Sequence, residues 1–286
     1  MSKKTLLGAC TWLFGNLTLT EIARRLRGLG FDGVELMGDL DTTRAAEASQ
    51  IVLDHGLAVL SVTPADRSGG RLVDLAHPDP AVRAESVGYY RRLLEFAAEL
   101  GQRQQRTGIQ PIVGCHGHVG RVRAIGTSAE ERAAFVEAVR QVAERARSMG
   151  LHLVLEVLNR YEAHLNCTAA ETVQFVAEVG SDAVGILLDA YHMNIEEADP
   201  AAAVRLANGR LWLYHVADSN RQGIGRGHTD FSAQLAALAE VRFAGPVIME
   251  CTAPGPDPFS AIKDAGSVTW LETYLKESAV WLRARL

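Results

Sequence analysis

The sequence predicts an α/β fold, a single (β/α)8 TIM barrel that forms one domain over residues 1–286. Short apolar runs alternate with longer amphipathic segments along the whole chain. There are eight such runs, and most are apolar almost throughout, which is typical of parallel strands covered by helices. Barrels of this class routinely reach 286 residues as one domain.

The eight predicted strands follow one another at regular intervals. They are residues 6–11, 33–38, 58–64, 109–117, 151–158, 184–192, 211–219 and 246–252. The segments between them, such as LTEIARRLRGLG, have the 3.6-residue period of helices packed on a sheet, and a last helix is expected near residues 267–285. A doubly wound open sheet is the alternative, but no GxGxxG motif follows the first strand.

Turn and capping residues agree with these boundaries. A glycine that follows a helical run supplies a left-handed C-cap and lets the chain turn back into the sheet. The glycines in such places are Gly30, Gly56, Gly150, Gly180 and Gly209. Capping-box spacing at Ser128 and Glu131, and again at Thr168 and Glu171, predicts two helix starts.

Composition argues against several classes of partner. The net charge is −5, so we expect neither nucleic acid nor an anionic membrane as a partner. The four cysteines are scattered without a CxxC pair, which argues against a disulfide framework or a thiolate zinc site and fits a reducing compartment. No run approaches the ~20 apolar residues of a membrane span. We therefore expect a cytoplasmic protein.

Each of the last four predicted strands carries a polar residue that interrupts its apolar run. These residues are Glu156 in LVLEVL, Asp189 in ILLDAYH, His215 in LYHVAD and Glu250 in VIMEC. The chemistry of such barrels takes place at the C-terminal ends of the strands. Three carboxylates and one imidazole that converge there suit one divalent ion of the Mn, Mg or Co type, with positions left open for substrate.

The opposing interpretation is that each acidic residue only caps a helix or joins a loop salt bridge. That is common for one strand end, but four consecutive ends with metal-competent residues favour a metal site. A buried bare carboxylate costs several kcal/mol unless a cation or hydrogen-bond donors meet it. A bound ion would explain why Glu156 directly follows an apolar run.

Four segments around these strand ends resemble the ketose 3-epimerases, the group that includes D-tagatose and D-psicose 3-epimerases. This group belongs to the xylose-isomerase-like TIM-barrel superfamily. The segments are LEVLNRYE, LLDAYHMNIEE, HVADSNRQGIGRGHTDF and IMEC. The resemblance covers the whole chain in architecture and is tightest over residues 151–251. It implies that the four strand-end residues bind one metal ion, with Mn²⁺ expected and Mg²⁺ or Co²⁺ as alternatives. It also implies that Glu156 and Glu250 are the catalytic acid/base pair, and that the chain forms a homodimer or homotetramer.

The same resemblance implies that Glu162, His192 and Arg221 hold the sugar near O1, O2 and O3. Support of the metal ligands is an equal alternative for His192. Two segments at the predicted mouth depart from the family, HGHVGR (116–121) and TAPGPDPF (252–259), and they leave the identity of the sugar open.

Three further residues are candidates for substrate binding. His116 and His118 lie at the end of the fourth strand, where they either contact substrate or form loop hydrogen bonds. Trp12 lies at the end of the first strand, directly after residue 11, and is either an apolar wall for the sugar or ordinary core.

The chemistry expected of this set is inversion at C3 of a free ketose. A proton leaves the carbon beside the ketone, an ion stabilises the enediolate, and a proton returns on the opposite face. Two carboxylates can exchange the roles of base and acid in such a reaction.

Rival reactions begin with the same proton abstraction. They are aldose–ketose isomerisation, and lyase or dehydratase chemistry on a keto-sugar, inosose or 3-keto-glycoside. A sugar phosphate is also open, because GIGRGHTDF (223–231) is either a phosphate-binding loop or a substrate loop before a helix start at Asp230. A non-enzymatic sugar-binding barrel would tolerate loss of a ligand residue, and none is lost. An apurinic endonuclease of this superfamily needs histidines that the second and third strands lack.

Overall fold

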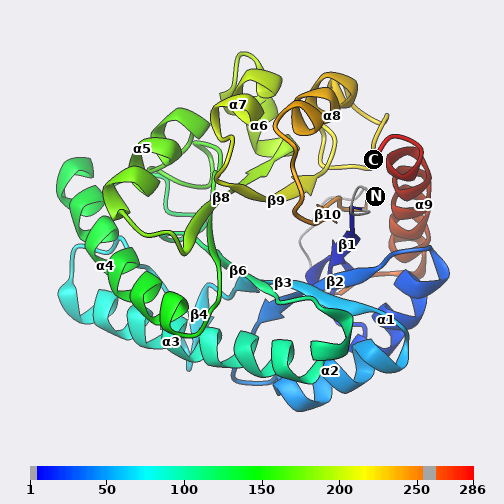
Figure 1. The fold of residues 1–286 in the computed structure, drawn as a ribbon, viewed down its shortest axis with the longest axis horizontal. Helices are drawn as coiled ribbons and strands as arrows, with labels where there is room; N and C mark the ends of the chain where they lie inside the picture. The colour runs from blue at the N-terminus through cyan, green and yellow to red at the C-terminus, as the bar shows by residue number, and fades with distance from the viewer. Residues whose placement is uncertain (1–4, 254–261) are drawn as a thin grey trace.

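Eight parallel strands form a closed barrel in the computed structural model, which describes residues 5–253 and 262–286. Around the ring their order is β1-β10-β9-β8-β7-β6-β3-β2 (Figure 1). The barrel strands are β1 (Leu7–Cys10), β2 (Gly33–Gly38), β3 (Ala58–Pro64), β6 (Ile112–Cys115), β7 (Leu153–Glu156), β8 (Val184–Asp189), β9 (Leu211–Val216) and β10 (Val247–Met249). The predicted (β/α)8 fold is therefore confirmed.

Helices surround the barrel and bury the outer face of its strands (Figure 1). They are α1 (Leu19–Gly28), α2 (Ala45–Asp54), α3 (Pro80–Arg103), α4 (Ser128–Ser148), α5 (Ala169–Val179), α6 (Ala190–Glu196), α7 (Pro200–Leu206), α8 (Phe231–Glu240) and α9 (Ala265–Arg283). Short 3₁₀ turns are η1 (Thr11–Phe14) and η2 (Gln105–Thr107). The apolar faces predicted from the helical period pack on the strands and form one core.

One helix start and one strand end differ from the prediction. The capping box of α4 joins Thr127 and Glu130, one residue before the predicted pair, and this frees Glu131 for a buried ion pair. The predicted strand 184–192 ends at Asp189. The Asp189 side chain accepts a hydrogen bond from the Tyr191 backbone N–H (2.9 Å), caps α6 and ends the strand there.

The connection between β3 and α3 holds an antiparallel pair, β4 (Arg67–Ser68) and β5 (Arg71–Leu72), that the sequence did not predict. Two-residue strands are too short to leave an alternating pattern. The predicted cap at Gly180 is present, since its φ of 71° lies in the left-handed region that glycine adopts without strain.

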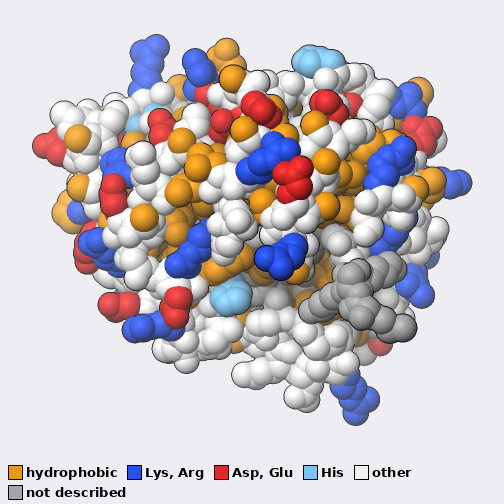
Figure 2. Space-filling model, turned by 45° about the horizontal axis from the view of Figure 1, so that its top comes forward, with side chains coloured by type: hydrophobic (Ala, Val, Ile, Leu, Met, Phe, Trp, Pro, Cys, Tyr) orange, Lys and Arg blue, Asp and Glu red, His pale blue; other side chains and the backbone are white. Residues whose placement is uncertain are grey.

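Strand register sets the positions of the functional side chains. The ring closes where β1 pairs with β10, and Asp189 on β8 lies opposite His215 on β9. The face in Figure 2 intersperses Lys and Arg with Asp and Glu between apolar side chains. Within the described ranges, no helix combines the length and apolar character that crossing a membrane requires. The single-domain organisation stays a prediction.

Candidate metal centre and active site

The structure brings together the four polar residues that interrupt the last strands. Glu156 and Asp189 end β7 and β8, His215 lies one residue before the end of β9, and Glu250 follows β10 directly. One ligand atom from each lies within 4.8 Å of the other three. Because their strands are neighbours in the ring, side chains far apart in the sequence meet at one end of the barrel.

The cluster is almost closed to solvent. Asp189, His215 and Glu250 are buried, and only 9% of the Glu156 side chain is exposed. His215 Nδ1 lies 3.1 Å from Glu250 Oε2. Three carboxylates therefore share a small buried volume with one imidazole, which is costly unless positive charge compensates them.

Arg221 supplies part of that positive charge. Its Nη1 donates to Asp189 Oδ2 (2.9 Å), and its Nη2 lies 2.9 Å from Glu250 Oε2. The guanidinium also lies over the Tyr191 ring, 4.5 Å from the centroid. Arg221 has a positive φ of 61°, and its turn is fixed by hydrogen bonds from the Arg221 N–H to the Asp218 carbonyl and from the Thr252 N–H to the Arg221 carbonyl. Its buried Nε has no partner within the described residues.

The two glutamates have pKa values shifted in opposite directions. Burial raises the pKa of Glu156 well above its ordinary value, and the negative charge of Glu250 adds to the effect. Burial also acts on Glu250, but Arg221 and His215 outweigh it and hold the pKa of Glu250 well below the usual range. Burial raises the pKa of Asp189 to about 6 despite Arg221. Opposed environments of this kind separate an acid from a base.

These residues fit a divalent ion. Three carboxylate oxygens and one imidazole nitrogen are the donors that Mn²⁺-type ions accept, and they lie close enough together to share one centre. Burial first, and then the negative charge of Glu250, raise the pKa of Glu156, and a bound cation would offset both effects. The structure therefore contains a cluster that can hold a metal, and the identity of the ion belongs to the proposal below.

His192, Asn159 and Glu162 form a connected group beside the cluster. His192 Nδ1 lies 2.7 Å from Asn159 Nδ2, which also donates to Glu162 Oε1 (2.9 Å). His192 Nε2 lies 3.5 Å from Asp189 Oδ2 and 3.9 Å from Glu156 Oε1. The structure thus places His192 against the ligand candidates and Glu162 at the more exposed end. Asn159 lies in the LEVLNRYE segment, but the sequence does not predict its contact with His192, because His192 follows another strand.

His116 and His118 are not members of the four-residue cluster, but they share a small cavity with one of its members, Glu156. Both line a small cavity with Phe135, Leu155 and Glu156, and the Nδ1 atoms of both histidines are buried without a hydrogen-bond partner among the described residues. Burial lowers the pKa of His116 to about 4. Imidazole nitrogens without a partner beside a cavity are available to a ligand hydroxyl, and substrate contact by these residues stays a prediction.

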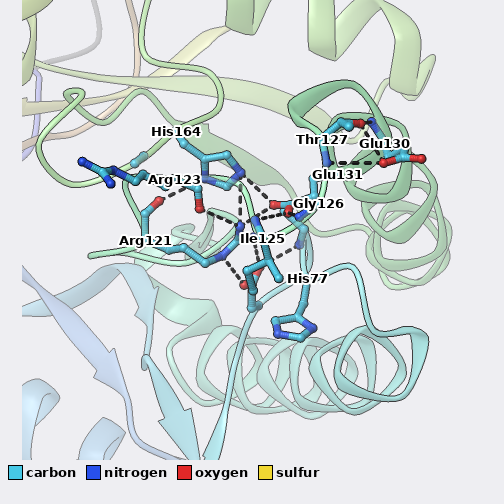
Figure 3. Close-up of polar contacts among 12 residues, drawn as sticks. His77, Arg121, Arg123, Ile125, Gly126, Thr127, Glu130, Glu131 and His164 are labelled. Carbon is cyan, nitrogen blue, oxygen red and sulfur yellow. Dashed lines mark hydrogen bonds and ion pairs between the residues drawn. The ribbon is translucent and has the colours of Figure 1, made fainter.

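Arg121, the last residue of the HGHVGR segment, belongs to a largely buried ion network (Figure 3). Arg121 pairs with Asp74 through Nε–Oδ2 (2.8 Å) and with Glu131 through Nη1. His164 Nε2 lies 2.8 Å from the same Glu131 oxygen. Asp74 precedes α3, Arg121 precedes α4 and His164 precedes α5, so the network joins three loops at the mouth of the barrel.

The remaining sequence candidates lie at the edges of the site. Trp12 belongs to η1, is partly buried, and lines a groove with Leu36 and Met37 that includes none of the four cluster residues. Residues 254–259 of the predicted mouth segment lie outside the described residues. Glu35 on β2 was missed altogether, although it is 2% exposed and its Oε2 lies 3.2 Å from His215 Nε2.

A family model described as xylose isomerase-like TIM barrel matches residues 23–285. The chain belongs to this family. The chain is 32% identical over 237 residues to the L-ribulose 3-epimerase of Mesorhizobium japonicum. The aligned region covers 81% of this chain and 75% of the relative. It is also 29% identical over 258 residues to the 3-dehydro-D-guloside 4-epimerase of Escherichia coli, covering 89% and 94% of the two chains.

A comparison with solved structures agrees with these matches. A D-psicose 3-epimerase with D-tagatose from Clostridium cellulolyticum superposes with a TM-score of 0.84 at 25% identity, covering 98% of this chain and 99% of that one. The predicted resemblance to ketose 3-epimerases is confirmed. The predicted enzyme class, an isomerase of the sugar epimerase type, is confirmed as well.

Proposed function

We propose that this protein inverts C3 of a free ketose, using one divalent ion, with Mn²⁺ the expected species. The observation that carries the proposal is the buried cluster of Glu156, Asp189, His215 and Glu250, whose ligand atoms lie within 4.8 Å of one another. The ketose 3-epimerase names of the relatives support the choice of substrate and carbon.

The side chains divide the chemistry between them. When bound, the ion polarises the substrate carbonyl and stabilises the negative charge that develops on its oxygen. Glu156 and Glu250, on β7 and after β10, act on the C3 proton: one removes it and the other returns a proton to the opposite face. Their environments already differ, since Arg221 and His215 contact Glu250 directly.

The sugar oxygens would be held by the group around His192. Asn159 and Glu162 present amide and carboxylate atoms beside this ring. Arg221 presents a buried Nε that lacks a partner among the described residues, and a substrate hydroxyl would satisfy it. Trp12, His116 and His118 stay candidates for the more distant end of the sugar.

A free sugar is favoured over a sugar phosphate by the hydrogen bonds of loop 223–231. The buried Asp218 carboxylate accepts from the N–H groups of Gly225 (2.8 Å) and Thr229 (3.1 Å). It also accepts from its neighbour Ser219 (2.7 Å). Backbone N–H groups that would bind phosphate in a glycine-rich loop are thus committed to an internal anion.

The test is isotope entry in deuterated water. The Mn²⁺-loaded enzyme is incubated with free ketoses, sugar phosphates and 3-dehydro-glycosides, and the recovered sugars are analysed by NMR. Deuterium at C3 of a free ketose is the expected result. Label at C1 or C2 would indicate aldose–ketose isomerisation, and loss of water or aglycone would indicate a lyase. Absence of label in every free ketose would overturn the proposal.

A second candidate is C4 epimerisation of a 3-dehydro-glycoside. The match to the E. coli 4-epimerase, which covers 94% of that relative, favours it, and the same proton abstraction beside a ketone would serve. In the same experiment this activity places deuterium at C4 of the glycoside and none at C3 of a ketose. A homodimer or homotetramer and a cytoplasmic location stay predictions.

A further inference from the structure

A fourth buried carboxylate lies next to the cluster but outside it. Glu35 comes from β2, and register places it between Cys10 on β1 and Ser61 on β3. A shift in register between Val34 and Glu35 sets this alignment. Such irregularities re-aim a side chain, so the strand is locally adapted to its position.

Both oxygens of Glu35 are committed to named partners. The Cys10 thiol donates to Oε1 (3.2 Å), and the Ser61 hydroxyl donates to Oε2 (2.6 Å). The remaining contact of Oε2 is His215 Nε2, at 3.2 Å. Two neighbouring donors thus hold the carboxylate in place and aim it at the imidazole.

The His215 ring therefore lies between two carboxylates. Glu35 faces Nε2 at 3.2 Å, and Glu250 faces Nδ1 at 3.1 Å. Glu250 belongs to the four-residue cluster that can hold an ion. Among the described residues, Glu35 lies close enough to share an ion with Cys10 and His215 but not with the other three members of that cluster. A neutral imidazole has one N–H and one lone pair, so a carboxylate at one nitrogen decides which nitrogen can bind an ion.

We propose that Glu35 is a positioning residue: it accepts the N–H at Nε2 of His215 and so presents the Nδ1 lone pair to the ion. This inference rests on the proposed metal-dependent function. Hydrogen bonds to the far nitrogen of a histidine ligand typically account for 10–100-fold in metal affinity. Glu35 is not one of the four proposed ligands, and in this proposal it acts on the ion through the imidazole of His215.

The first test uses the wild-type protein, so it does not depend on a variant that folds. Histidine nitrogen NMR of the protein loaded with diamagnetic Mg²⁺ reports which ring nitrogen carries the proton, and His215→Gln assigns the signal. We expect the N–H at Nε2. A proton at Nδ1 would overturn the proposal, and would also be the result if the ion bound between Cys10, Glu35 and His215.

The second test measures Mn²⁺ affinity by calorimetry in the metal-free protein and in Glu35→Gln. The amide keeps the size of the side chain but can donate, so it permits the opposite imidazole tautomer. We expect at least about tenfold weaker binding. Glu47→Gln, an exposed change on α2, is the matched control and should bind like the wild type. Equal affinity in Glu35→Gln would overturn the role of Glu35 alone, whereas a wild type that binds no Mn²⁺ would overturn the proposed function too.

Discussion

Two of the proposed metal ligands, Glu156 and Glu250, also have a proposed role that is separate from binding the ion. Glu156 and Glu250 are expected to serve twice, as ligands and as the acid/base pair, and their pKa values are shifted in opposite directions by burial and by Arg221. A neutral amide at either position keeps an oxygen for the ion but cannot exchange a proton. Substitution therefore separates the two roles.

Glu156→Gln and Glu250→Gln should each lower kcat at least about 100-fold with Mn²⁺ at saturation, because general acid–base catalysis contributes about 10²–10⁴-fold. Formation of the C3 epimer measures the same loss, because it needs both glutamates, whereas either one alone could still exchange the proton on its own face. Glu144→Gln, an exposed change on α4, is the control and should leave kcat unchanged. Near-normal epimerisation by either active-site variant would remove that glutamate from acid/base chemistry.

The sequence reveals site residues that leave a local signal. Glu156, Asp189, His215 and Glu250 each interrupt an apolar run, so their pattern is visible without a structure. Glu35 also lies in an apolar strand, but its partner His215 is 180 residues away. The local pattern of apolar and polar residues gives no information about a contact between two residues so far apart in the sequence. For this reason the sequence did not predict the contact between Glu35 and His215.

At the level of elements, the boundaries of the eight strands and the last helix were predicted to within a few residues. Buried parallel strands and amphipathic helices have very different patterns of apolar residues, so the two are easily told apart. Boundaries were less certain. The predicted strand 184–192 ran three residues too far because Asp189 serves both as a strand end and as the cap of α6. The β4–β5 pair and the ion network around Arg121 depend on contacts between loops. The spacing of apolar residues along the sequence does not predict such contacts.

The ion network of Arg121, Asp74, Glu131 and His164 is expected to make the stability of the protein depend on pH in the acid range. Burial opposes ionisation of Glu131, but Arg121 and the N–H groups of Gly126 and Ile125 outweigh it and lower its pKa from 4.5 to about 2. The stabilisation is therefore complete above about pH 4.5 and is lost as the pH falls towards 2. The linked free energy is about 3 kcal/mol.

Glu131→Gln should be less stable than the wild type at pH 7, and the difference in unfolding free energy should shrink as the pH falls below about 4.5. Urea unfolding between pH 7 and 3.5 measures it. Glu144→Gln on the same helix is the control and should follow the wild type throughout. A constant difference between wild type and Glu131→Gln at every pH would show that the ion network is not its source.

For the whole molecule, the closed ring is what connects the ion to stability. Strands β7, β8, β9 and β10 are consecutive in the ring, and each supplies one residue of the cluster. An ion held by all four would link a continuous arc of the barrel. A ligand that binds only the folded state adds stability according to its concentration relative to Kd.

Mn²⁺ at about 100 times its Kd should raise the unfolding free energy by about 2.7 kcal/mol, and chelation should reverse the gain. Thermal unfolding measures the change as a rise in Tm of several degrees, since each kcal/mol shifts the Tm of a large domain by about 2–4 °C. Asp189→Asn removes one charged ligand while keeping a side chain that can still cap α6, so its response to Mn²⁺ should be much smaller. An equal rise in Tm in Asp189→Asn would place the stabilising ion elsewhere on the molecule, because only an ion held by the strand ends depends on that carboxylate.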